Sequence, residues 1–251
     1  MRNAGKVAVV TGGASGIGLA FAQRWISDGG RAVLFDINEE ALGSAANMLD
    51  RATVRPVQCD VVDLASVQAA LSSVRAEEGR LDALMNGAGV IIPQSSAEVS
   101  DVDFERVVDV HLVGTFRLCR EAYSLLKDSK GSIVNVTSVA ARSGMPRRAS
   151  YCAAKASLEG LTRTLAVEWA RDGIRVNSVA PGYTKTEMTG PLIKQGKLNA
   201  ERVEARTPLR RFAEASEIAS AISFLFSEDA SYITGHSLVV DGGMTIDGDW
   251  V

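Results

Sequence analysis

Cysteine and histidine are scarce in this chain, and their scarcity argues against metal and disulfide chemistry. The 251 residues include three cysteines, Cys59, Cys119 and Cys152, which lie far apart and form no CxxC pair. Neither a disulfide framework nor a zinc site is therefore expected. The only two histidines are His111 and His236, so a histidine-rich metal site is not expected either. We expect no bound metal ion.

The chain also lacks an excess of positive charge and a long apolar run. Its 27 Lys and Arg residues are balanced by 30 Asp and Glu residues, which gives a formal net charge of -3. This balance leaves no polycationic surface to neutralise nucleic-acid phosphates. No run approaches the roughly 20 apolar residues of a membrane span, and nothing before residues 7–10 resembles a signal peptide. We expect a cytoplasmic protein with no nucleic-acid and no membrane partner.

Three catalytic motifs are absent as well. The sequence contains no GxSxG elbow, no HExxH pair and no GxxxxGK[ST] phosphate loop. These motifs are typical of α/β hydrolases, zinc proteases and P-loop NTPases. Hydrolase and NTPase functions are therefore not supported.

Short β-branched runs alternate with longer amphipathic stretches along the whole chain. Seven strands are predicted, at residues 7–10, 32–35, 54–58, 83–85, 132–136, 175–179 and 238–240. Helix start signals stand between them at Asn38, Asp63 and Ser100. This order predicts an α/β fold of the doubly wound Rossmann type, with a seven-stranded parallel sheet and helices on both faces. Residues 1–251 are expected to form one domain, in which residues 183–212 form a substrate loop.

A glycine-rich turn follows the first strand. Residues 11–18 read TGGASGIG, and a helical pattern continues over residues 19–27. Glycines at such a turn let the backbone approach a pyrophosphate, whose charge is favoured by free N–H groups and the helix dipole. The alternative is a tight turn that only packs helix on strand. The predicted phosphate contacts are Gly12, Ser15, Gly16, Ile17 and Gly18.

An acidic residue, Asp36, ends the second strand. A carboxylate there accepts hydrogen bonds from ribose hydroxyls and repels a 2′-phosphate, so NAD is the expected cofactor. The alternative is that Asp36 only caps the next helix. Further contacts are expected after the third and fourth strands, where a doubly wound sheet presents its ligand crevice. These predicted contacts are Asp60, Val61, Asn86, Ala88 and Gly89.

Tyr151 and Lys155 lie in a long helical stretch, residues 149–170, and their spacing of four places them on one face. An ammonium group beside a phenol is expected to lower its pKa from about 10, so that Tyr151 exchanges a proton with an alcohol or carbonyl oxygen. Ser138 follows the fifth strand, where its hydroxyl can bind the reacting oxygen. The expected catalytic residues are therefore Ser138, Tyr151 and Lys155.

With these motifs the chain resembles the short-chain dehydrogenase/reductase family, from about Lys6 to Gly243. The turn matches TGxxxGxG, the pair matches YxxxK, and Ser138 stands where the family keeps its serine. NSVAPG at residues 177–182 and VDGG at residues 240–243 also resemble family segments. The resemblance implies that Tyr151 is the acid/base, that Lys155 tunes it and binds ribose, and that Ser138 orients the substrate.

The resemblance also implies how the nicotinamide is held. In relatives the backbone after the Pro-Gly turn binds its carboxamide, which points here to Pro181, Gly182 and Thr184, with Thr186 as a second contact. Many relatives assemble as homotetramers through the helices that correspond to residues 104–127 and 149–170 and through the seventh strand. A homotetramer is therefore expected. The tail at residues 244–251, with Ile246 and Trp250, either docks on a neighbouring subunit or is a loose terminus.

The chain departs from the family pattern at two positions. His111 stands where relatives usually have an Asn that holds a proton-relay water. His111 either binds that water as a catalytic residue or is a buried imidazole hydrogen-bonded to backbone. Gly87 replaces the second Asn of the family's NNAG pattern, and only a local change beside the cofactor is expected from it.

Basic residues gather near the expected substrate site. Seven lie in residues 183–212, and three more lie between Ser138 and Tyr151: Lys185, Lys194, Lys197, Arg202, Arg206, Arg210, Arg211, Arg142, Arg147 and Arg148. If they form the pocket mouth, an anionic small-molecule substrate is favoured; the alternative is a solvated charged surface.

Three functions stay open. The leading one is an NAD(H)-dependent oxidoreductase of a secondary alcohol such as a polyol, sugar or hydroxy compound, supported by Asp36. The second is a 3-oxoacyl-[acyl-carrier-protein] or acyl-CoA reductase, although relatives of that kind often prefer NADP. The basic pair that some of them use to grip the carrier protein is also poorly matched by Ser129-Lys130 and Arg171-Asp172. The third is a dinucleotide-binding regulatory protein whose catalysis is impaired at His111.

Overall fold

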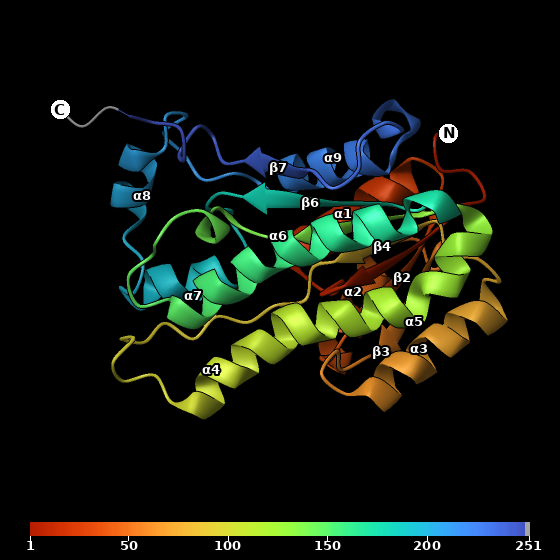
Figure 1. Ribbon diagram of the computed structural model, residues 1–251, viewed down its shortest axis with the longest axis horizontal. Helices are drawn as coiled ribbons and strands as arrows, with labels where there is room; N and C mark the ends of the chain where they lie inside the picture. The colour runs from red at the N-terminus through yellow and green to blue at the C-terminus, as the bar shows by residue number, and fades with distance from the viewer. Residues whose placement is uncertain (249–251) are drawn as a thin grey trace.

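A seven-stranded parallel sheet forms the centre of the computed structural model, which describes residues 1–248 (Figure 1). The strand order is β3-β2-β1-β4-β5-β6-β7, and every neighbouring pair is parallel. This confirms the predicted doubly wound α/β fold. The strands are β1 Val7–Thr11, β2 Arg31–Asp36, β3 Val54–Gln58, β4 Ala83–Asn86, β5 Ser132–Val136, β6 Arg175–Pro181 and β7 Ser237–Val240.

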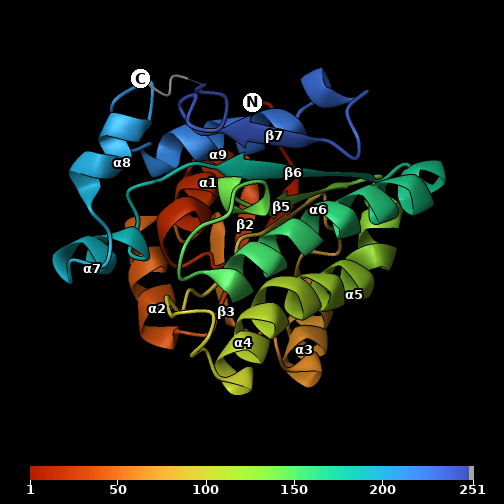
Figure 2. The same ribbon diagram turned by 60° about the vertical axis from the view of Figure 1, so that its left-hand side comes forward.

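Helices cover both faces of the sheet (Figure 2). On one face α1 and α9 pack together through Phe21, Trp25 and Phe226, whose rings are in mutual contact. On the other face α3, α5 and α6 bury side chains such as Leu71, Leu118 and Leu165 against the sheet. The helices are α1 Gly16–Ser27, α2 Glu39–Met48, α3 Leu64–Glu77, α4 Asp101–Val108, α5 Gly114–Ser129, α6 Ala149–Trp169, α7 Thr189–Lys194, α8 Ala200–Arg206 and α9 Ala215–Phe226.

The local sequence explains where several helices begin. Asn38, Asp63 and Ser100 are the N-caps of α2, α3 and α4, and each side chain accepts a backbone N–H from the first turn. The predicted start signals are therefore confirmed.

The central strands β1 and β5 are buried along their whole length because helices cover both of their faces.

The predicted helix at residues 104–127 is interrupted in the structure. A single π-helical turn, Asp109–Val113, separates α4 from α5. Such turns are uncommon and often occur at functional sites. This one contains His111.

Residues 183–212 contain two short helices, α7 and α8, which the sequence analysis did not anticipate. Leu192, Leu198, Val203 and Phe212 form a small apolar cluster within this segment. In Figure 1, β6 and β7 point toward the side of the molecule where α7 and α8 lie. The segment therefore stands at the carboxyl edge of the sheet.

Two absences apply to the part of the chain that the structure describes. None of its helices is both long and apolar enough to cross a membrane. Within the same residues, no three His, Cys, Asp or Glu side chains gather as metal ligands. Of the predicted docking tail, Ile246 is 87% exposed, and Trp250 lies outside the described residues.

Candidate active site

A cleft of about 370 Å³ opens at the carboxyl edge of the sheet. Residues that follow β1 to β6 line it, as expected where the strand order reverses between β1 and β4. With the single exception of Asn86, all the predicted site residues lie in its wall: Gly12, Ser15, Gly16, Ile17, Gly18, Asp36, Asp60, Val61, Ala88, Gly89, His111, Ser138, Tyr151, Lys155, Pro181, Gly182, Thr184 and Thr186.

Asn86 lies beneath the cleft and not in its wall. Its amide nitrogen donates to Asn135 Oδ1 at 2.8 Å and to Cys119 Sγ at 3.3 Å. Asn135 in turn donates to Thr162 Oγ1 at 2.9 Å. These contacts place the Asn86 side chain on the face of the sheet that α5 and α6 cover. Its placement supports a structural role linking β4 and β5 to the helices above them.

The glycine-rich turn between β1 and α1 leaves no room for side chains at key positions. A Cβ on Gly18 would lie 2.2 Å from the Gly12 carbonyl oxygen, and Gly12 and Gly16 have φ values of +63° and +51°. Ser15 is the N-cap of α1, but its side chain makes no capping hydrogen bond. The first N–H groups of α1 are therefore available to an anion, and the turn fits a pyrophosphate.

The Asp36 carboxylate is fixed at the end of β2. It accepts backbone N–H groups from Ala14 at 3.3 Å and from Asn38 at 3.1 Å. The N-cap of α2 is Asn38, whose side chain accepts from Ala41 N at 3.0 Å. The alternative in which Asp36 only caps this helix is therefore wrong. Asp36 presents its carboxylate at the cleft wall, where it can accept hydrogen bonds from a ribose.

Tyr151 and Lys155 project from the first turns of α6 toward Ser138. The Lys155 Nζ atom lies 5.6 Å from the centre of the Tyr151 ring and donates to the Val136 carbonyl at 2.6 Å. The Ser138 hydroxyl forms a hydrogen bond with Tyr151 and also accepts from Ala140 N at 3.1 Å. The three predicted catalytic side chains therefore meet at one point of the cleft.

The electrostatics of this group differ from the prediction. Burial raises the pKa of Tyr151, and the Ser138 hydrogen bond and the Arg148 charge only oppose that rise. Burial also lowers the pKa of Lys155 from 10.5 to about 7. The predicted lowering of the Tyr151 pKa by Lys155 is therefore wrong for this structure, because the lysine is itself desolvated and bonded to Val136.

His111 is buried beside Tyr151. The two rings meet edge to face at 5.4 Å, and Nε2 lies 2.8 Å from the Val90 carbonyl oxygen. A Cβ on Gly89 would lie 2.3 Å from the imidazole Cε1, so the glycine leaves space for this ring. Burial and the Lys155 charge lower the pKa of His111 to about 3. His111 is therefore a buried, neutral imidazole hydrogen-bonded to backbone, as the second alternative expects, and its ring borders the cleft.

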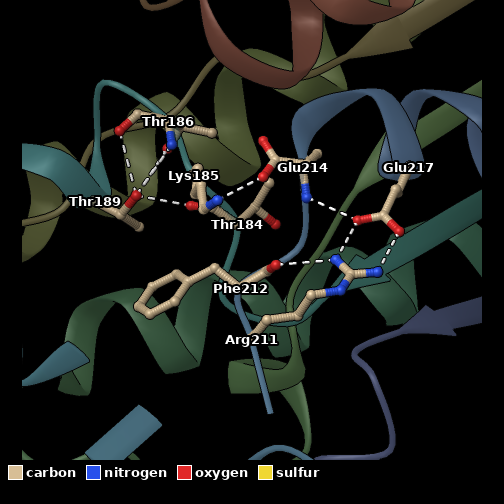
Figure 3. Close-up of polar contacts among 8 residues, drawn as sticks. All are labelled: Thr184, Lys185, Thr186, Thr189, Arg211, Phe212, Glu214 and Glu217. Atoms are coloured by element: carbon tan, nitrogen blue, oxygen red, sulfur yellow. Dashed lines mark hydrogen bonds and ion pairs between the residues drawn. The ribbon is translucent and has the colours of Figure 1, made fainter. Parts of the chain in front are cut away.

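Residues 184–189 form the strip after β6, and this strip contacts the start of α9 (Figure 3). Lys185 pairs with Glu214 at 2.6 Å, and Arg211 contacts both carboxylate oxygens of Glu217 at 2.6 Å. The Thr189 hydroxyl donates to the Thr184 carbonyl at 2.7 Å and accepts from Thr186 N at 3.1 Å. These contacts hold Thr184 and Thr186 at the cleft wall, where the resemblance placed them.

The expected basic mouth is not formed by most of its predicted members. Of the ten basic residues named above, only Arg148 lines the cleft. Arg142, Lys185 and Arg211 are instead paired with Glu159, Glu214 and Glu217. An apolar wall on the substrate side was not predicted from the sequence, because its side chains come from three separate segments. That wall consists of Val90, Ile91, Met145, Tyr183, Met188, Leu192 and Leu198.

The comparisons with known proteins agree with this site. Residues 12–245 match the family profile described as Enoyl-(Acyl carrier protein) reductase. The chain is 41% identical to D-threitol dehydrogenase of Mycolicibacterium smegmatis, over 96% of this chain and 94% of that protein. It is 38% identical to meso-2,3-butanediol dehydrogenase of Serratia marcescens, over 98% and 96%. The 3-oxoacyl-[acyl-carrier-protein] reductase FabG of Thermotoga maritima is 36% identical, over 98% and 100%.

Solved structures give the same result. The crystal structure of levodione reductase superposes with a TM-score of 0.93 at 32% identity and covers 98% of this chain and 99% of its own. The chain belongs to the short-chain dehydrogenase/reductase family. It is an oxidoreductase that acts on CH–OH groups, in a family that uses NAD(P).

Proposed function

We propose that this enzyme uses NAD(H) to interconvert a small secondary alcohol, such as a polyol, sugar or hydroxy compound, and its ketone. The Asp36 carboxylate carries the choice of cofactor. It is held at the cleft wall by two backbone N–H groups, and its neighbour in that wall is Ile37. A 2′-phosphate at this position would be repelled by the carboxylate.

The family cofactor supplies or accepts the hydride when it is bound. Tyr151 gives a proton to the carbonyl oxygen during reduction and takes one from the alcohol during oxidation. The single hydroxyl proton of Ser138 is donated either to the same oxygen or to the Tyr151 oxygen, and it stabilises negative charge on the oxygen that it binds. Lys155 would bind the ribose, and its ammonium or amine stays hydrogen-bonded to the Val136 carbonyl. His111 borders Tyr151 as a neutral group.

A 3-oxoacyl thioester reductase is the second candidate, favoured by the similarity to FabG proteins. The surface that would have to grip a carrier protein argues against it. Asp172 lies there and binds Lys127 Nζ and the Tyr123 hydroxyl, each at 2.7 Å. A carboxylate at this position would repel an acidic carrier protein.

The decisive experiment compares NADH with NADPH. Binding is measured by cofactor fluorescence, and reduction rates are measured on neutral ketones, keto-sugars and a 3-oxoacyl thioester. NADH-dependent turnover of a ketone or keto-sugar supports the proposal. A preference for NADPH with the thioester favours the reductase instead. Tight NADH binding without turnover of any compound supports the third candidate, a regulatory dinucleotide-binding protein.

We also propose a homotetramer. Phe116 on α5 and Val167 on α6 are exposed by 40% and 79%, although both belong to long helices on one face of the sheet. The edge strand β7 is only partly covered within one chain. Exposed apolar groups of this kind are typical of interfaces between subunits. Sedimentation analysis would test the assembly, and a monomer at micromolar concentration would contradict it.

A further inference from the structure

One arginine of the substrate side faces the cleft, and its guanidinium is held in place. Arg148 donates from Nη1 to the Tyr183 hydroxyl at 3.0 Å. Its Cζ atom lies 5.9 Å from the centre of the same ring, and Nη1 also contacts Met145 Sδ at 3.6 Å. All three residues line the cleft. The charge therefore has a defined position in the pocket wall.

This guanidinium has no acidic partner. Among residues 1–248, no carboxylate lies within ion-pair distance of Arg148, whereas Arg142 and Arg211 each have one. A guanidinium has five N–H donors, and the contacts named above use one of its nitrogens. Arg148 is partly buried, so its charge is less well solvated than that of a free arginine. The unused donors of such a group favour a planar anion.

The backbone explains why neighbouring arginines point differently. Arg147 has a φ of +64°, which is uncommon for a residue with a side chain, and its carbonyl accepts from Gln94 N at 2.9 Å. Residues held in this region often occur at ligand sites. Arg147 is exposed and outside the cleft wall, whereas Arg148 turns into the cleft at the N-cap of α6.

Arg148 is also close to the reacting group. It is the N-cap of α6 and precedes Tyr151 by three residues. Its positive charge lowers the pKa of Tyr151 against the effect of burial. A substrate whose reacting carbon lies next to Tyr151 would therefore have its neighbouring atoms near the Arg148 guanidinium.

We propose that Arg148 determines substrate specificity by binding the carboxylate of a short hydroxy acid or oxo acid. This inference rests on the proposed function and narrows its substrate class. The carboxylate contacts the guanidinium, while the reacting carbon one or two bonds away meets Ser138 and Tyr151. The apolar residues Ile91, Leu192 and Leu198 on the remaining wall favour a short hydrocarbon chain.

The test compares a charged substrate with its neutral counterpart. Reduction by NADH is measured for 3-oxobutanoate, for its methyl ester and for a ketose phosphate, with the wild type, Arg148→Gln, Arg148→Lys and Arg147→Asn. The wild type should prefer 3-oxobutanoate over the ester in kcat/KM, and this preference should fall as salt is raised. Arg148→Gln should lower the preference by about 30-fold, mainly through KM.

The two other variants serve as controls. Arg148→Lys keeps the charge but loses the planar fork, so it should retain part of the preference. Arg147→Asn removes the same charge one residue away, and asparagine tolerates its backbone conformation. It should leave the preference unchanged.

An ester preference in the wild type, or an equal preference in Arg148→Gln, would overturn the inference while NADH-dependent turnover still supports the proposed function. Preference for the ketose phosphate would overturn the assignment to a carboxylate. If none of these three compounds is turned over, the proposed function is still decided by the neutral ketones and keto-sugars of its own experiment. The inference is then decided by thermal unfolding: 3-oxobutanoate should stabilise the NADH complex of the wild type and not that of Arg148→Gln.

Discussion

The two ends of the cleft are held by different kinds of contact. At the glycine-turn end, formed by residues 11–18 and Asp36, the geometry depends on backbone atoms and on the absence of Cβ atoms at Gly12 and Gly18. At the segment end, formed by residues 183–212, it depends on side chains such as Lys185 with Glu214 and the apolar cluster around Leu192. The glycine conformations are set within the turn itself, whereas the Lys185–Glu214 pair joins residues 29 positions apart.

This difference suggests that the two ends of the cleft have different roles in binding. A turn whose shape requires glycine can bind the same dinucleotide in many proteins, because every contact is made by the backbone. A segment held by side chains can change its lining residues while its attachment stays the same. The glycine-turn end should therefore determine the cofactor and the segment end the substrate, with Tyr151 and Lys155 between them.

The largest expected effect separates chemistry from dinucleotide binding. Tyr151→Phe removes only the hydroxyl that exchanges the proton, so kcat should fall by about 10³-fold. Dinucleotide affinity should stay within a few-fold, because the glycine turn and Asp36 are untouched. Steady-state rates and NADH fluorescence titration measure the two effects. The fully exposed Tyr232→Phe is the control, and a loss of less than ten-fold in Tyr151→Phe would contradict the assigned role.

The second prediction concerns Lys155, which lies between the two ends. Its pKa is about 7 in the folded protein and about 10.5 when solvated. Between these values the unfolded chain binds the extra proton and the folded protein does not, so folding stability rises with pH. The effect is absent in Lys155→Met. From pH 7.5 to 9.5, the unfolding free energy of the wild type should increase relative to Lys155→Met by up to about 2.7 kcal/mol.

Urea denaturation at several pH values measures this difference. The exposed Lys197→Met variant should show no comparable change against the wild type. A difference between wild type and Lys155→Met that is flat with pH would mean that the lysine is not desolvated. Its ammonium would then be free to stabilise the Tyr151 phenolate, as the sequence alone predicted.

The same contrast explains what could be predicted from sequence. The strands, the glycine turn and Asp36 depend on local patterns, and no predicted strand end differs from the observed one by more than two residues. The helices α7 and α8 were missed because they are short and their apolar residues belong to a small cluster separate from the two main cores. The Tyr151 pKa and the orientation of Asn86 were also missed, since burial and strand facing are properties of the assembled fold.

The third prediction tests the cofactor choice at the glycine-turn end. Asp36→Asn removes the charge and keeps one of the two oxygens, of which Oδ2 accepts from Ala14 N and Oδ1 from Asn38 N. The ratio of kcat/KM for NADPH to that for NADH should rise by about 10- to 100-fold, because the repulsion of a 2′-phosphate is lost. Glu39→Gln, an exposed neighbour in α2, is the matched control. An unchanged ratio would remove the main support for NAD.

The smallest expected effect lies where the two ends touch. Glu187 belongs to the strip after β6, yet its Oε2 atom would lie only 3.3 Å from a Cβ placed on Gly16 in the glycine turn. A carboxylate beside this turn repels a pyrophosphate, although its exposure to solvent weakens the repulsion. Glu187→Gln should therefore lower the Kd for NADH by about three-fold at low salt, and less as salt increases.

Glu201→Gln removes the same charge from α8, away from the cleft wall, and should leave the Kd unchanged. Fluorescence titration at two salt concentrations is sufficient for the comparison. Equal Kd values for wild type and Glu187→Gln would mean that the carboxylate moves away from the turn before the dinucleotide occupies it. The two ends of the cleft would then be energetically independent, and substitutions in residues 183–212 could change the substrate without any cost in cofactor affinity.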